Sequence, residues 1–170
     1  MPSYRVLQIT TPSTDFCKAT KAVEIAEVPT PSAGNVVVQS HYVGINATDI
    51  NVTNGAYGNT LTSGLESTGV VYAVGEGVSN VMVNDAVAYQ RSFGILFVDC
   101  HGRVRDTCVK LGAFVEYVEA PAASLIKLPE VSPVVVPLTV CGISASLALE
   151  KAGRLGTNET VFVTAAAGGT

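Results

Sequence analysis

The stretch "NVVVQSHYVGI", residues 35–45, decides the fold, because it is the strongest indication of a β-strand in the chain. Three consecutive valines followed by a mixture of polar, aromatic and β-branched residues are typical of a strand with a buried side. The next segment, "NATDINVTNGAYG" at 46–58, is punctuated by Asn and Gly and indicates a short helical turn plus a loop. Polar loops that leave a rigid strand often carry functional groups.

Further short strand candidates lie on both sides of this stretch. They are "YRVLQIT" (4–10), "KAVEIAEV" (21–28), "STGVVYAVGEGV" (67–78), "DAVAY" (85–89), "GAFVEYVEA" (112–120) and "SLIKLPE" (124–130). Many short strands at close spacing predict a closed or nearly closed barrel. One segment, residues 91–110, does not fit, because a connection of this length inside a compact domain is uncommon and is usually functional or disordered.

The composition changes near Pro133. From Leu138 to Ala152 the apolar residues recur at helical spacing, and Gly153 is expected to cap the C-terminal end of this helix. The chain then reaches "VFVTAAAGGT", residues 161–170, which has the pattern of a buried parallel strand turning toward a phosphate-binding helix. A strand-rich region followed by helix, strand and glycine turn predicts entry into an α/β domain.

Charge and hydrophobicity exclude several partners. The 170 residues carry 10 Lys and Arg against 14 Asp and Glu, and the basic residues are scattered, so neither nucleic acid nor an anionic membrane surface is expected as a partner. No apolar run approaches the roughly twenty residues of a spanning helix. The N-terminal segment has neither a secretory nor a transit pattern, which makes the cytoplasm the expected location.

The four cysteines are Cys17, Cys100, Cys108 and Cys141. Their wide and irregular spacing is unlike a disulfide framework or a zinc knuckle. We expect reduced thiols that act as small buried hydrophobic side chains.

Several segments, in this order, resemble the medium-chain dehydrogenase/reductase superfamily. They are "GINATDINVTNGAYG", "GLESTGVVYAVGEGV", "DAVAY", "GAFVEY", "LTVCGISASLALEKAG" and "VFVTAAAGGT". Within the superfamily the chain is most similar to the zinc-independent quinone oxidoreductases, and particularly to the prostaglandin-reductase-like branch with its Ala-Ala-Ala-Gly-Gly turn. The resemblance covers nearly the whole chain except residues 91–110, which are expected to be a retained intron, a gene-model error or a lineage-specific loop.

The resemblance implies a mainly β fold, in which a GroES-like barrel domain at 1–130 binds the substrate. Residues 131–170 would then be the start of an incomplete Rossmann domain, reduced to its first helix and strand. The implied cofactor is NADPH. Relatives commonly form a homodimer through the Rossmann sheet, an option that is open to a full-length form but not to this chain. Since a dinucleotide site needs a whole βαβ unit, this chain alone is not expected to catalyse.

The resemblance also implies that no catalytic zinc is bound. Where zinc-dependent relatives have a Cys and a His as metal ligands, this chain has Asn46 and Leu65, and the remaining Glu66 could not hold a zinc that needs three protein ligands. A separate metal site from Cys100, His101 and Cys108 would lack a fourth ligand and is not expected.

Two candidate catalytic residues follow from the match to the quinone oxidoreductases. Asn46 and Tyr57 are expected to hydrogen-bond the carbonyl oxygen of the substrate, with Tyr57 or water supplying a proton. The structural alternative is that Asn46 only shapes its turn and Tyr57 only covers the barrel mouth. Asp49 is expected to be a helix cap or a structural acceptor, and His41 a structural histidine.

The candidate cofactor-binding residues lie in the last third of the chain. They are Gly142 and Ser144 at the helix start, and Ala167, Gly168, Gly169 and Thr170 in the glycine turn. The leading function is NADPH-dependent reduction of quinones or α,β-unsaturated ketones. The alternative is a non-enzymatic barrel module that acts in protein interaction, and cochaperonin function is weaker because a shared fold does not carry function.

Overall fold

The computed structural model describes residues 3–56, 61–91, 112–164 and 166. Its strands are β1 (Tyr4–Ile9), β2 (Thr20–Ile25), β3 (Asn35–Val43), β4 (Glu66–Val74), β5 (Ala86–Gln90), β6 (Tyr117–Pro121) and β7 (Ile126–Lys127). Its helices are α1 (Phe16–Ala19), α2 (Thr48–Thr53), η1 (Ala122–Ser124), η2 (Leu138–Gly142), α3 (Ile143–Leu147) and η3 (Ala148–Ala152). The part of the chain that is described is therefore mainly β, as the sequence predicts.

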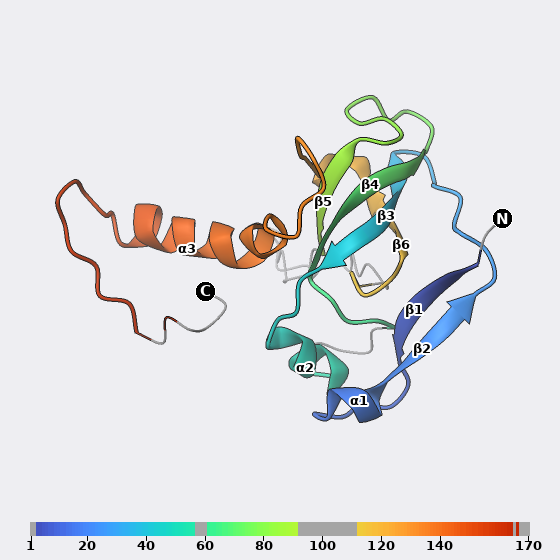
Figure 1. Cartoon of the computed structure of the whole chain (residues 1–170), viewed down its shortest axis with the longest axis horizontal. Coiled ribbons are helices and arrows are strands. Elements are labelled where there is room, and N and C mark those ends of the chain that lie inside the picture. The colour runs from blue at the N-terminus through green and yellow to red at the C-terminus, as the bar shows by residue number, and fades with distance from the viewer. Residues whose placement is uncertain (1–2, 57–60, 92–111, 165, 167–170) are drawn as a thin grey trace, which may run out of the picture.

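Five of the strands form one antiparallel sheet in the order β6-β3-β4-β5-β7, and β1 and β2 form a hairpin beside it (Figure 1). Single bridges join the hairpin to the segments around the larger sheet, at Val6 with Val115 and at Gln8 with Thr62. The backbone of Glu116 extends this link, because its N–H donates to Arg5 and its carbonyl accepts from Ser40 of β3. These contacts give the curved, nearly closed arrangement that the strand spacing predicts.

Much of the core lies under β3, which pairs with β6 on one side and with β4 on the other. Val36, Val37 and Val38 are all fully buried, which explains the continuous apolar run in the sequence. They pack with Val71 of β4 and Val118 of β6, the two strands that flank β3. β3 ends at Val43, three residues before Asn46, and β4 begins at Glu66.

Tyr89 of β5 is buried in the same core, and its hydroxyl has no hydrogen-bond partner among the described residues. Burial raises the pKa of Tyr89 to about 12, against an ordinary value near 10. The neutral phenol is thus favoured in the folded state, and its contribution to stability is complete below about pH 10 and lost as the pH rises toward about 12.

We expect Tyr89→Phe to stabilise the protein by about 1 kcal/mol at neutral pH, because the unpaired buried hydroxyl is removed. The variant should also lose less stability than the wild type between about pH 10 and pH 12, by on the order of 2 kcal/mol. Urea unfolding at both ends of this range measures the two effects. Tyr42→Phe is the control for the loss of a phenol hydroxyl, because Tyr42 is 44% exposed.

The helix predicted from Leu138 to Ala152 is confirmed, although two of its three segments, η2 and η3, have π-helical hydrogen bonding. It projects away from the barrel (Figure 1). Gly153 does not provide the left-handed cap that the sequence predicts, since its φ is −75°. Arg154 has the positive φ of 50° instead.

The strand predicted at the start of "VFVTAAAGGT" is not formed. Residues 161–164 are irregular and exposed, and the Phe162 side chain is 89% exposed. A strand needs a neighbour to complete its backbone hydrogen bonds, and none of the described strands pairs with this segment. The prediction of a strand at this position is therefore wrong for residues 161–164, because no described strand supplies the pairing that it needs.

Other expectations differ in detail or lie outside the described residues. The strand expected at 112–120 begins only at Tyr117, because residues 112–116 make one isolated bridge, at Val115, and loop hydrogen bonds. Of the unusual segment 91–110, only Arg91 is described; it is buried and donates from Nη1 to the Thr62 carbonyl at 3.1 Å. Among the described helices, none has the length and apolar character needed to cross a bilayer.

Candidate active site

The backbone after β3 is held by a buried carboxylate. Asp49, in the first turn of α2, accepts the Asn46 backbone N–H on Oδ2 at 2.8 Å. Its Oδ1 accepts the Ser63 hydroxyl at 2.7 Å and the Gly64 N–H at 2.9 Å. The expectation that Asp49 is a structural acceptor is confirmed. It fixes the turn that carries Asn46 against the segment leading into β4.

The Asn46 side chain belongs to a group of polar residues between the barrel and the helix, which we call the polar cluster: Asn46, Glu66, Thr139 and Cys141. Asn46 Nδ2 donates to Glu66 Oε1 at 3.0 Å, and the Cys141 thiol donates to Asn46 Oδ1 at 3.6 Å. On its other oxygen, Glu66 accepts the Thr139 hydroxyl at 2.6 Å and the Val140 N–H at 3.0 Å. The cluster therefore ties β4 to η2 through one carboxylate.

Glu66 is 1% exposed, so the environment of its carboxylate is set by these donors. Gly44 leaves the necessary space, because a Cβ at residue 44 would overlap the Glu66 carboxylate. A glycine at the end of β3 is thus required by a side chain of β4. Burial of a carboxylate is costly unless several donors satisfy it, and here three donors do so.

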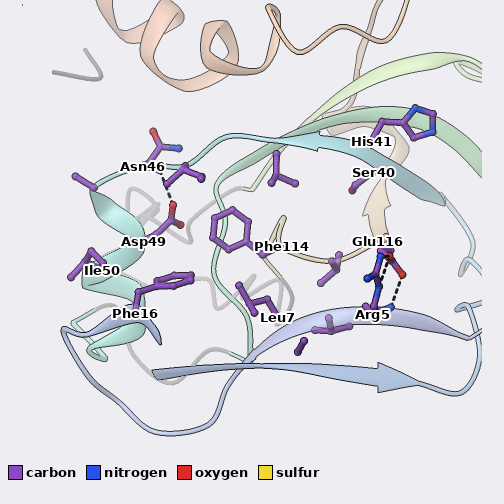
Figure 2. Close-up of a pocket in the computed structure, with 16 residues that line it drawn as sticks. Arg5, Leu7, Phe16, Ser40, His41, Asn46, Asp49, Ile50, Phe114 and Glu116 are labelled. Atoms are coloured by element: carbon purple, nitrogen blue, oxygen red, sulfur yellow. Dashed lines mark hydrogen bonds and ion pairs between the residues drawn. The ribbon is translucent and has the colours of Figure 1, made fainter. Parts of the chain in front are cut away.

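Beside the polar cluster lies a groove of about 770 Å³ between β1, β3 and α2 (Figure 2). Its walls are largely apolar and include Leu7, Phe16, Ile45, Ile50 and Phe114. Cavities of this size and character suit small organic ligands. The Asn46 amide points away from this groove, toward the side where the helix lies, so the groove and the polar cluster are neighbours that face different ways (Figure 2).

An ion pair lies at the other end of the groove from Asn46 (Figure 2). The Arg5 side chain donates from Nε to Glu116 Oε1 at 2.8 Å, and its backbone N–H donates to Oε2 at 2.7 Å. These hydrogen bonds from Arg5 lower the pKa of Glu116. The pair is largely exposed and is expected to contribute little to stability.

The structure brings Asn46 into the polar cluster, whereas the two described cofactor candidates, Ser144 and Gly142, contribute no side chain to it. Ser144 is exposed and donates its hydroxyl to the Val140 carbonyl at 2.7 Å, within its own helix. Gly142 is helical, and a Cβ there would contact the Leu138 side chain of the preceding turn. Tyr57, Ala167, Gly168, Gly169 and Thr170 lie outside the described residues.

Two cluster members were missed by sequence reasoning. Cys141 was expected to be a buried hydrophobic side chain, but it is half-buried and its thiol bonds Asn46. Thr139 had no expected role. The available signal was their position at the start of the predicted helix.

Cys17, also expected to be buried, is exposed. His41 is exposed along the groove rather than packed inside the barrel.

The described residues contain no cluster of three or more His, Cys, Asp or Glu side chains that could hold a metal ion. Leu65, next to Glu66, is buried and offers no donor atom to a metal. Cys100, His101 and Cys108 lie outside the described residues.

Comparison with known proteins places the barrel in a family. Residues 32–130 match the model described as the alcohol dehydrogenase GroES-like domain. The chain belongs to the medium-chain dehydrogenase/reductase superfamily. It is 35% identical to a probable quinone oxidoreductase of Leishmania amazonensis, over 99% of this chain and 45% of that protein. It is 36% identical to prostaglandin reductase-3 of Mus musculus, over 96% of this chain and 40% of that protein.

A solved mycobacterial structure, complexed with NADPH, has the same fold with a TM-score of 0.69 at 22% identity. The match covers 92% of this chain and 44% of the mycobacterial protein. The chain thus spans less than half the length of these relatives, so their whole activities do not transfer to it directly.

Proposed function

We propose that this chain supplies the substrate-binding barrel of an NADPH-dependent, zinc-independent oxidoreductase that reduces quinones or α,β-unsaturated ketones. The observation that supports the proposal is the position of Asn46 at the junction of barrel and helix, where Asp49 accepts its backbone N–H and Glu66 accepts its side-chain amide. The names of the relatives, quinone oxidoreductase and prostaglandin reductase, support the same chemistry.

The donor chemistry of the polar cluster fits a substrate that contains a carbonyl group. Asn46 Nδ2 has two hydrogens, and Glu66 accepts one of them. The second has no acceptor among the described residues and can donate to a carbonyl oxygen. NADPH, when bound, would supply a hydride. Gly142, Ser144 and residues 167–170 are the proposed contacts for it.

In this proposal Asn46 binds the carbonyl oxygen of the substrate. As negative charge grows on that oxygen during reduction, the N–H donor becomes more strongly bonded and lowers the barrier. Because its backbone and its side chain are both held, the amide needs little rearrangement during the reaction. Tyr57 or water is the proposed proton source.

The first test concerns the protein that source cells make, because a dinucleotide site needs a whole βαβ unit. We expect its intact mass to be roughly twice the 17.6 kDa of this chain, in line with the 45% coverage of the Leishmania relative. That protein should oxidise NADPH when a quinone or an enone is added. The proposal is abandoned if neither substrate class accelerates NADPH oxidation.

In that protein we expect Asn46→Ala to lower kcat/KM on the order of 100-fold, because one charge-stabilising donor is removed. Asn35→Ala is the matched control. Asn35 also donates its side-chain amide to a glutamate, Glu119, at 2.9 Å, but it lies at the far end of β3. Steady-state kinetics should show nearly unchanged activity for the Asn35 variant. Equal losses in both variants would mean that Asn46 is only structural.

A second candidate function, a non-enzymatic module that binds a protein partner, is favoured by one observation. The helix and the tail expose large apolar side chains, with Leu138 54%, Leu147 52% and Phe162 89% exposed. Titration with NADPH separates the two proposals. Binding favours the reductase, whereas no binding together with a stable specific protein complex favours the module.

A further inference from the structure

We propose that Glu66 is a positioning residue, which fixes the orientation of the Asn46 amide so that it presents an N–H, and not its oxygen, to the carbonyl group of the substrate. The inference deepens the proposed function and rests on it. It also contains a part that does not depend on catalysis, namely which way the Asn46 amide is turned.

The orientation of the Asn46 amide follows from its two neighbours. An ionised carboxylate can only accept hydrogen bonds, so the end of the amide that faces Glu66 must be the nitrogen. The Cys141 thiol can donate, which suits the amide oxygen at the other end. With Glu66 removed, only the weak thiol contact would distinguish the two orientations.

Glu66 can impose this orientation because its own position is determined by the helix. Its Oε2 accepts the hydroxyl of Thr139 and the N–H of Val140, both in η2. A backbone N–H within a helix cannot change its role or its direction. The orientation of Asn46 in the barrel is therefore linked to the placement of the helix, through a carboxylate that is 1% exposed.

The Glu66→Gln substitution tests the orientation of the Asn46 amide, because it leaves the size of the side chain at residue 66 nearly unchanged. The glutamine oxygen must remain on the Val140 N–H, so its NH₂ group faces Asn46 Nδ2 and places two donors against each other. Rotation of the Asn46 amide by half a turn removes this conflict, because its oxygen then accepts from Gln at residue 66. The Asn46 oxygen then occupies the former position of the nitrogen. The amide therefore presents a lone pair, instead of an N–H, to the carbonyl group of the substrate.

NMR on the 170-residue chain tests the orientation of the Asn46 amide. The measurement is the set of nuclear Overhauser contacts made by the Asn46 side-chain NH₂ protons. In the wild type we expect contacts to the Glu66 methylene protons. In Glu66→Gln we expect the contacts to move to the Cys141 methylene protons. Glu119→Gln is the control, since Glu119 likewise accepts an asparagine amide and a backbone N–H, from Asn35 and Ser32. Unmoved Asn46 contacts in a folded Glu66→Gln chain would overturn the proposal.

The catalytic consequence is tested in the protein from source cells. Glu66→Gln should lower kcat on the order of 10- to 100-fold, with the KM for NADPH nearly unchanged, because the residue acts through Asn46. Glu119→Gln should retain wild-type kinetics. A Glu66→Gln enzyme with full kcat would overturn the positioning role.

A double variant, Asn46→Asp with Glu66→Gln, distinguishes this role from a purely structural one. The new glutamine donates to the new aspartate, so the hydrogen bond is kept with donor and acceptor exchanged and the double variant should remain folded. Activity should remain low, because a carboxylate now faces the substrate. Recovery of activity would contradict the donor role. If the wild type reduces neither quinones nor enones, the catalytic part fails with the proposed function, while the NMR contacts still decide the orientation.

Discussion

Replacement of Gly69 by alanine is expected to destabilise the protein by about 3 to 5 kcal/mol or to prevent folding, which is comparable to the whole stability of many domains. Gly69 lies in β4, opposite Ser40 of β3 and next to an irregularity in the register of the two strands. A Cβ on Gly69 would overlap the carbonyl group of Gln39. That group is backbone, so the clash can be relieved only by separating β3 from β4.

Urea unfolding of Gly69→Ala measures this effect, and Gly77→Ala is the control. Gly77 has a φ of 79°, but a Cβ there would have no atom within 4 Å. Its replacement should therefore cost only about 1 to 2 kcal/mol for the left-handed backbone. A Gly69 variant as stable as the Gly77 variant would show that the β3–β4 register differs from that described.

The strands of the sheet could be predicted from the sequence, because the apolar residues of the local pattern are the ones that the fold buries. The run at Val36–Val38 is apolar without interruption, and the structure buries all three side chains. The terminal segment 161–164 has an equally apolar pattern, but it forms no strand among the described residues. Apolar pattern therefore indicates the tendency to form a strand, whereas formation depends on a neighbouring strand that supplies hydrogen bonds.

The polar cluster could be predicted only in part. The resemblance to quinone oxidoreductases singled out Asn46, but Glu66 was considered only as the remnant of a metal site. Its partners in η2 are 73 and 74 residues away along the chain, and no periodicity relates residues at that separation. A side-chain hydrogen-bond network of this kind depends on tertiary packing, so it required the structure.

Asp49→Ala is expected to lose about 3 to 5 kcal/mol of stability, because three donors lose a shared buried acceptor. These donors are the Asn46 N–H, the Ser63 hydroxyl and the Gly64 N–H. Asp49 is 2% exposed, so water cannot easily replace the carboxylate.

Asp85→Ala is the matched control for this prediction. Asp85 also accepts a backbone N–H three residues earlier, from Met82 at 2.9 Å, and it pairs with Lys127 near the surface. Solvent can take over these interactions, so urea unfolding should show a much smaller loss for Asp85→Ala. Equal losses would mean that burial does not set the strength of the Asp49 interactions. Because the Asn46 backbone is held by Asp49 and its side chain by Glu66, Asp49→Ala should also reduce any reductase activity, even under conditions where the variant remains folded.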